Sequence, residues 1–145
     1  MPTTTVPASI NRPATTSSQA GAVISKRHSH LVDSSAEFTG AGDKIALGVL
    51  PAGHEIVDCI LEGGDLDSGT AVVITVGSED DPDLLITSST VCQAGGIARM
   101  NNPDGPKFAA VDVDTIIYMH AGTPPGTDID AVCALTLMYR AKQSN

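Results

Sequence analysis

From residue 34 onward the chain alternates between short apolar segments and clusters of turn residues. Gly, Pro, Asn and Asp fill the clusters, and they end strands because Gly supplies positive φ, Pro fixes φ, and Asn or Asp hydrogen-bonds within its own turn. No stretch of ten residues has a convincing helical period. The pattern predicts seven or eight short strands in an all-β domain, an antiparallel β-sandwich or jelly-roll-like fold. The apolar segments span residues 45–50, 55–62, 71–77, 84–87, 108–113, 115–120 and 131–140.

The last segment has apolar residues on both faces of the strand that it predicts. Successive side chains of a strand point to opposite faces, so residues 131–140 divide into two rows. One row is Ala131, Cys133, Leu135, Leu137 and Tyr139, and the other is Val132, Ala134, Thr136, Met138 and Arg140. Segment 71–77 also lacks a properly polar face. We therefore expect both sheet faces to be covered in places, by a second sheet or by another subunit.

The N-terminal residues have a different composition. Residues 1–20 contain eleven Thr, Ser or Pro and no acidic residue, which is too little apolar surface to offset the entropy of ordering. We expect an extended N-terminal arm over residues 1–34 and a β-sandwich domain over residues 35–145. The arm is either a disordered tail or a segment that orders against a neighbouring subunit. In the second case Val23 and Ile24 could form a strand on the edge of that neighbour's sheet.

Charge separates the arm from the body. The chain has 17 Asp and Glu against 8 Lys and Arg, a net charge of −9. Arg12, Lys26 and Arg27 against Asp33 give +2 through residue 35, which leaves −11 on the remainder. Because acidic bodies repel one another, an arm could join them, with contacts predicted at Val23, Ile24, Lys26, Arg27 and His28. The acidic balance argues against nucleic acid and anionic membranes as partners.

The residues that could carry chemistry form no recognisable site. His28 and His30 would share one side of a strand near Asp33, but no second cluster completes a tetrahedral metal site. The acidic segment 79–83 and the pair Asp65 and Asp67 do not fit the pattern of a calcium-binding loop. No Ser lies in a Gly-x-Ser-x-Gly turn, and His54 and His120 occur singly. The sequence therefore predicts no metal, no cofactor and no enzyme.

Turn motifs carry the most specific signal in the chain. Residues 47–80 read LGVLPAGHEIVDCILEGGDLDSGTAVVITVGSED, residues 88–96 read SSTVCQAGG, and the last strand ends LTLMYR. This order resembles a family of small structural proteins of tailed bacteriophages, encoded among head genes. They show an LPAGA-I-D corner, a DLDSG turn, a V-VG strand end, an S-T-AQAGG loop and a final L-L-YR strand. The resemblance covers residues 38–140. His54 and Glu55 stand where that pattern is small or apolar, and Cys92 replaces a more ordinary residue.

The resemblance implies a β-sandwich virion protein at the capsid surface. It would decorate or cement the capsid by binding the major capsid protein and copies of itself, with a trimer as the favoured homo-oligomer. The alternative is a head-fibre or tail-associated module that binds a receptor or glycan through loops 65–69, 101–106 and 122–127. The absence of Trp weakens that alternative, because sugar sites usually present an aromatic platform. Tyr118 and Tyr139 both fall in predicted strands.

Three cysteines, Cys59, Cys92 and Cys133, are too few and too scattered for a secreted disulfide framework. Their odd number and the lack of a Cys-x-x-Cys motif also argue against structural zinc. Free thiols that behave as small hydrophobic residues are one interpretation. The other makes Cys59 and Cys133 intersubunit thiols, which would reinforce a shell after lysis into an oxidising medium.

Overall fold

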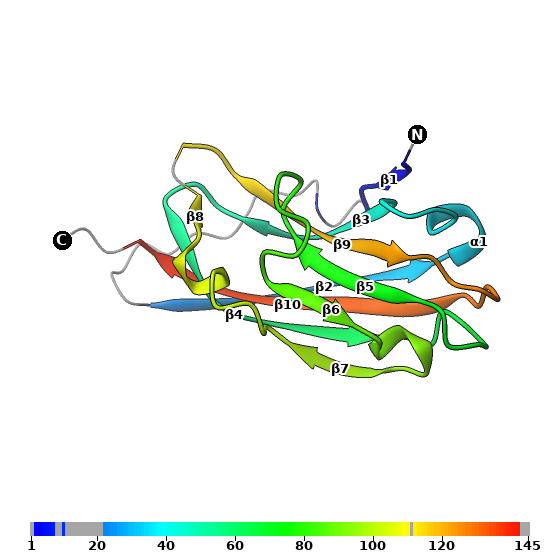
Figure 1. Ribbon diagram of the computed structural model, residues 1–145. Coiled ribbons are helices and arrows are strands. Elements are labelled where there is room, and N and C mark those ends of the chain that lie inside the picture. Colours follow the sequence, from blue (N-terminus) through cyan, green and yellow to red (C-terminus); the bar gives the residue numbers. More distant parts are fainter. Residues whose placement is uncertain (1, 8–9, 11–21, 111, 143–145) are drawn as a thin grey trace.

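The computed structural model describes residues 2–7, 10, 22–110 and 112–142, and within these residues the protein is an all-β sandwich of two sheets (Figure 1). Sheet A contains, in spatial order, β1 (Thr4–Thr5), β3 (Lys44–Leu50), β9 (Thr115–Thr123), β5 (Val73–Gly77) and β6 (Ile86–Ser89). Sheet B contains β2 (Val23–Val32), β10 (Ala131–Ala141), β4 (His54–Gly63) and β7 (Gly96–Arg99), with β8 (Ala109–Ala110) paired to the start of β4. The short helices are α1 (Ser34–Glu37), η2 (Val91–Gln93) and η3 (Gly105–Lys107). All pairs except β1–β3 are antiparallel, which confirms the predicted fold class.

The core lies between the two sheets and is mainly aliphatic. Alternate residues of each strand point inward, as the period-two patterns predicted. Phe38 and Tyr139 are the aromatic side chains among the largest fully buried residues. Central members with no exposed surface are Ile45, Leu47, Leu61, Ile74, Ile117 and Leu135.

Two predicted elements differ from the structure. Within its described residues, segment 108–113 contributes only the two-residue β8, and the chain bends at Asp112 and Val113 before it enters β9. Strand β7 lies outside the apolar segments that predicted strands. It follows Gly95 and begins at Gly96, whose φ angles are 85° and 151°, so a glycine turn and an edge strand share one short segment.

The division expected at residues 34 and 35 also differs. Residues 23–32 form β2, which pairs along its whole length with β10 of the same chain, from Val23 opposite Arg140 to Val32 opposite Ala131. Without β2, β10 would be a long edge strand with unpaired backbone groups. Residues 23–32 therefore belong to the sandwich.

Described residues before β2 also lie against the body. Thr4 and Thr5 pair with Lys44 and Ile45 of β3, and Ile10 packs on the outer side of sheet A. That N-terminal residues reach a neighbouring copy stays a prediction.

Candidate assembly surface

Asp67 fixes the loops that connect the two sheets at one end of the sandwich. Its buried carboxylate accepts five backbone N–H groups at 2.9–3.0 Å, from Gly69, Ala71, Val72, Gly126 and Thr127. These hydrogen bonds, with that of Gly126 the largest contribution, hold the pKa of Asp67 well below its usual range although burial opposes them. Both oxygens are thus engaged by backbone amides, which gives the DLDSG motif a structural role.

The outward-facing side chains of β2, β10, β4 and β7 form the surface that we call the sheet B face. The register brings Arg27 beside Thr136, Thr136 beside Ile60, and Ile60 beside Arg99 in one row across all four strands. Further members are Val23, Leu31, Glu55, Asp58, Glu62, Ile97, Val132, Met138 and Arg140.

Three ion pairs cross this face. Arg27 Nε lies 2.6 Å from Glu62 Oε2, and Arg140 Nε lies 2.8 Å from Glu55 Oε1. Arg99 pairs with Asp58. All three carboxylates come from β4, and each guanidinium side chain is more exposed than its partner, for example 69% for Arg99 against 19% for Asp58. The hydrogen bond from Arg27 lowers the pKa of Glu62. The outermost charged groups of the face are therefore arginines.

Exposed apolar side chains gather on the same face. Among the described residues, six large hydrophobic side chains are exposed, and four of them belong to it: Val23, Leu31, Ile97 and Val132. Leu31 and Val132 lie opposite each other in the β2–β10 register. The other two exposed residues, Val6 and Val113, lie elsewhere.

Charge also sets the sheet B face apart. Its three arginines balance the three carboxylates of β4, so its net charge is zero. The other described residues carry fourteen acidic side chains against Lys26, Lys44, Lys107 and Lys142, a net of −10. The rest of the surface therefore repels an acidic partner, and this face does not.

The five predicted contact residues are divided between the two sides of β2. Val23 and Arg27 point outward, whereas Ile24, Lys26 and His28 alternate with them on the partly buried inner side. Arg27 is paired with Glu62 of its own chain. Burial, followed by the charge of Lys26, lowers the pKa of His28. The five residues therefore do not form one contact surface in the structure.

The histidines of β2 do not converge on a shared site. His30 Nε2 lies 2.9 Å from Glu37 Oε2, and Glu37 also accepts the Asp33 N–H. Across the residues with described positions, no three His, Cys, Asp or Glu side chains are placed to hold a metal ion. None of the described helices has the length and apolar character to cross a membrane.

The cysteines lie differently from the predicted intersubunit pair. Cys59 and Cys133 have no exposed surface, so neither sulfur is accessible to another folded subunit. Cys59 lies opposite Leu137, four residues along β10 from Cys133. The structure instead brings Cys133 next to Cys92.

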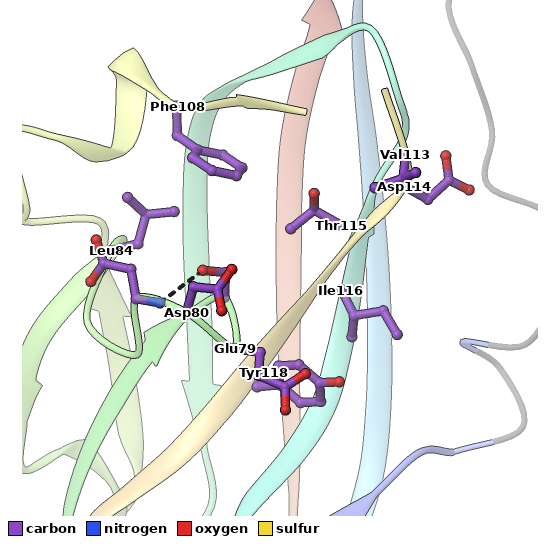
Figure 2. A pocket seen from close by; sticks show the side chains of 11 residues that line it. Glu79, Asp80, Leu84, Phe108, Val113, Asp114, Thr115, Ile116 and Tyr118 are labelled. Carbon is purple, nitrogen blue, oxygen red and sulfur yellow. Dashed lines mark hydrogen bonds between the residues drawn. The ribbon is translucent and has the colours of Figure 1, made fainter. Parts of the chain in front are cut away.

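A pocket of about 470 Å³ opens beside β9 on the other side of the sandwich (Figure 2). Tyr118 and Ile116 line it from β9, Phe108 lines it from the segment before β8, and Lys44 Nζ lies 2.9 Å from Glu79 Oε1 at its edge. Its described lining contains no residue of loops 65–69, 101–106 or 122–127, which were the predicted glycan-binding loops. The remaining lining residues are Ser78, Asp80, Asp81, Leu84, Val113, Asp114 and Thr115.

Those three loops do not gather at one place. Asp67 joins loop 65–69 to loop 122–127. Asn102 of loop 101–106 instead donates hydrogen bonds to the backbone carbonyls of Asp83 and Leu85, in the β5–β6 connection.

Sequence reasoning did not single out Leu31, Ile97, Arg99, Val132 and Arg140 as surface residues. The apolar character of both rows in segment 131–140 was the signal for Val132. Ile97 and Arg99 had no comparable signal, because β7 was not predicted.

No model of a known protein family matches the chain, and no curated protein matches it. Among solved structures, a chain from the capsid of Ralstonia phage GP4 superposes with a TM-score of 0.80 and 28% identity, over 92% of this chain and 94% of that chain. A chain from the capsid asymmetric unit of cyanophage Pam1 gives a TM-score of 0.73 at 20% identity, over 90% and 93% of the two chains. One from the capsid of Helicobacter pylori bacteriophage KHP30 gives 0.52 at 14%, over 80% and 86%.

At 20% and 14% identity, the Pam1 and KHP30 similarities establish the fold alone. The GP4 similarity extends over nearly the whole of both chains and adds sequence identity to the shared fold. Taken with the turn motifs, the GP4 similarity confirms that this chain is a small β-rich structural protein of the bacteriophage virion.

Proposed function

We propose that the protein decorates or cements the phage capsid, and that the sheet B face is the surface through which it binds the major capsid protein and copies of itself. The observation that carries the proposal is the joint presence, on one neutral face, of three arginines and four of the six exposed large hydrophobic side chains. Arginine is enriched in protein interfaces relative to the rest of the surface, and each arginine of this face is paired with a carboxylate of β4. A structural role of this kind requires no catalytic residue.

The size of the face suits this role. Strands lie about 4.8 Å apart and rise about 3.3 Å per residue. The four strands of sheet B, with 10, 11, 10 and 4 residues, therefore give a face on the order of 500 Å² in area. A specific interface buries about 800 Å² on each partner. The sheet B face therefore supplies a large part of one such interface, and many copies on a shell would strengthen the contact by multivalency.

The proposal also includes a homo-oligomer. Because the remaining surface carries the acidic excess, copies that meet around a local symmetry axis would do so through neutral or basic elements. A trimer is the favoured arrangement.

The receptor- or glycan-binding alternative has one specific feature in its favour, which is the pocket. Phe108 and Tyr118 there lie with several carboxylates, and sugar sites combine aromatic rings with polar groups. A glycan-array screen with competable binding, lost in Phe108→Ala, would favour this function over capsid decoration.

Capsid binding tests the main proposal. Expanded capsids that lack the protein are mixed with the wild type, Ile97→Asp or Val113→Asp. Ile97 and Val113 are 72% and 70% exposed, so both variants add one charge at an exposed apolar position. We expect Ile97→Asp to lower the affinity at least tenfold and Val113→Asp to bind normally. Equal binding by all three proteins would refute the role of the sheet B face.

A further inference from the structure

Two of the three buried cysteines are in contact. Cys92 lies in η2, between β6 and β7, and Cys133 lies in β10. Their side chains are hydrogen-bonded to each other, and neither has exposed surface. The Gly64 N–H also donates to Cys133 Sγ at 3.3 Å. All three cysteines are free thiols in the structure.

The backbone brings these sulfurs together at the end of β4. A Cβ atom on Gly63 would lie 2.8 Å from Val91 Cγ1 and 3.0 Å from Cys92 Sγ. A Cβ atom on Gly64 would lie 2.6 Å from the Val132 carbonyl oxygen. Two consecutive glycines therefore let η2 and the start of β10 close over this strand end, which fixes both cysteines against it.

We propose that Cys92 and Cys133 are a site of intrachain disulfide formation, closed when the virion leaves the reducing cytosol for an oxygenated medium. Dissolved molecular oxygen is the oxidant. The two thiols lose two protons and two electrons as the Sγ–Sγ bond forms, and oxygen accepts both to give hydrogen peroxide. The proposal rests on the virion assignment and is independent of which face binds the capsid.

The surroundings distinguish this pair from the third thiol. Hydrogen bonding with Cys92, together with the Gly64 N–H, lowers the pKa of Cys133, so Cys133 is the first of the two to ionise. Cys59 lies opposite Leu137, away from the pair along β10. Burial raises the pKa of Cys59 to about 12, and the hydrogen bond with Cys133, followed by burial, also raises the pKa of Cys92, so Cys59 is set apart by its position and not by its pKa.

A disulfide between Cys92 and Cys133 would affect the sheet B face through β7. Cys92 precedes β7 by a few residues, and β7 carries Ile97 and Arg99 of the sheet B face. A covalent bond from η2 to β10 ties this short edge strand to the middle of sheet B. Oxidation would thereby stiffen one border of the proposed docking face without adding a contact to it.

Peptide mapping of the purified full-length protein tests the site. The protein is kept in air-saturated buffer, denatured, alkylated, and cleaved after Lys, Arg and Glu. This cleavage places Cys59, Cys92 and Cys133 in separate peptides, residues 56–62, 80–99 and 108–140. We expect a linked pair of the last two peptides, lighter by two hydrogens than their sum, with Cys59 alkylated. The melting temperature should fall when reductant is added.

Matched variants separate the link from packing effects. Cys59→Ala removes a buried sulfur but should keep both the linked peptides and the reductant-dependent melting shift. Cys92→Ala and Cys133→Ala should lose both. Three alkylated cysteines after the oxygen exposure, under conditions that oxidise a small dithiol in the same solution, would overturn the proposal. So would a linked peptide that contains Cys59. Capsid binding is not measured in this experiment, so its failure would leave the proposed function standing.

Discussion

The two outer faces of the sandwich both carry apolar side chains, but the described N-terminal residues, 2–7 and 10, cover only sheet A. On sheet A, Ile10 packs against Ala46 and Tyr118, and Ile10 and Tyr118 are only 6% and 7% exposed. On sheet B, Leu31 is 62% exposed and Ile97 is 72% exposed. Among the described residues, the same kind of surface is thus covered by the chain itself on sheet A and exposed on sheet B.

Hydrogen bonds fix the covering segment on sheet A. The Thr3 N–H donates to Asp43 Oδ1 at 2.5 Å, and the Lys44 N–H donates to the Thr3 carbonyl at 2.9 Å. Asp43 also accepts the N–H groups of Thr39 and Gly40. The cover on sheet A is therefore built into the fold, whereas no described residue packs over Leu31, Ile97 and Val132 in the same way.

A substitution of Asp67 should have the largest effect on stability, because its carboxylate holds the loops that join the two sheets. Asp67→Asn places an NH₂ group against backbone N–H donors, leaves at least two of them unsatisfied, and should lower the free energy of unfolding by about 3 kcal/mol or more. Urea unfolding monitored by circular dichroism measures this change. Asp128→Asn, an exposed carboxylate nearby, is the control and should change stability little.

The same carboxylate predicts a pH dependence. Its pKa in the folded state is below its value in the unfolded chain, so its contribution is complete above about pH 4 and is lost as the pH falls through the folded pKa. The wild type should therefore lose stability on acidification more steeply than Asp67→Asn. Parallel acid dependences for the two proteins would contradict this account.

Charges introduced on the sheet B face should weaken capsid binding strongly and affect folding much less. The double variant Leu31→Asp/Val132→Asp replaces two apposed exposed residues, and we expect about a hundredfold loss of capsid affinity, or about 2.7 kcal/mol. Sedimentation of particles with bound protein measures it. The control, Val6→Asp/Val113→Asp, makes the same chemical change away from the face and should bind as the wild type does. Equal losses in both would indicate a nonspecific effect of charge.

The covered face can be opened at Ile10. Ile10→Ala should lower the free energy of unfolding by about 1–2 kcal/mol, because most of a buried aliphatic side chain is removed. Hydrogen exchange should accelerate in β1 but not in β2. Val6→Ala, at a position 40% exposed, should have a much smaller effect. Unchanged exchange in β1 would mean that Ile10 does not hold the N-terminal segment.

The smallest expected effect on stability concerns the arginines. Arg27→Gln removes an exposed ion pair and should leave the free energy of unfolding nearly unchanged. Lys107→Gln removes an exposed pair with Asp104 outside the sheet B face and should be equally mild. Only Arg27→Gln should weaken capsid binding, and the weakening should shrink at high salt. Equal capsid binding by both variants would exclude Arg27 from the contact.

The fold could be predicted from the sequence, because turn preferences and the two-residue period of strands depend on neighbouring residues. The turns around Gly53 and Asp67 and the alternation in residues 131–140 follow from a few neighbouring residues. The position of β2 in sheet B could not be predicted from the sequence. A Thr- and Ser-rich N-terminal segment followed by Lys and Arg has the composition of an extended arm. Only pairing with β10, more than a hundred residues later, makes residues 23–32 a strand.

The candidate surface was harder to predict for the same reason. Arg27, Arg99 and Arg140 are far apart in the chain, and only the register places each beside a carboxylate of β4. The Cys92–Cys133 contact likewise depends on how Gly63 and Gly64 let two segments approach. Sequence spacing favoured Cys59 and Cys133 instead, because both lie in predicted strands.

Side-chain footprinting of the capsid-bound protein would show whether the sheet B face contacts the capsid. Hydroxyl radicals oxidise exposed aliphatic side chains, so the reactivities of Leu31, Ile97 and Val132 can be compared with those of Val6 and Val113, free and on particles. We expect strong protection of Leu31, Ile97 and Val132 upon binding and little change at Val113. Protection of Val113 while Leu31, Ile97 and Val132 stay fully reactive would contradict this expectation.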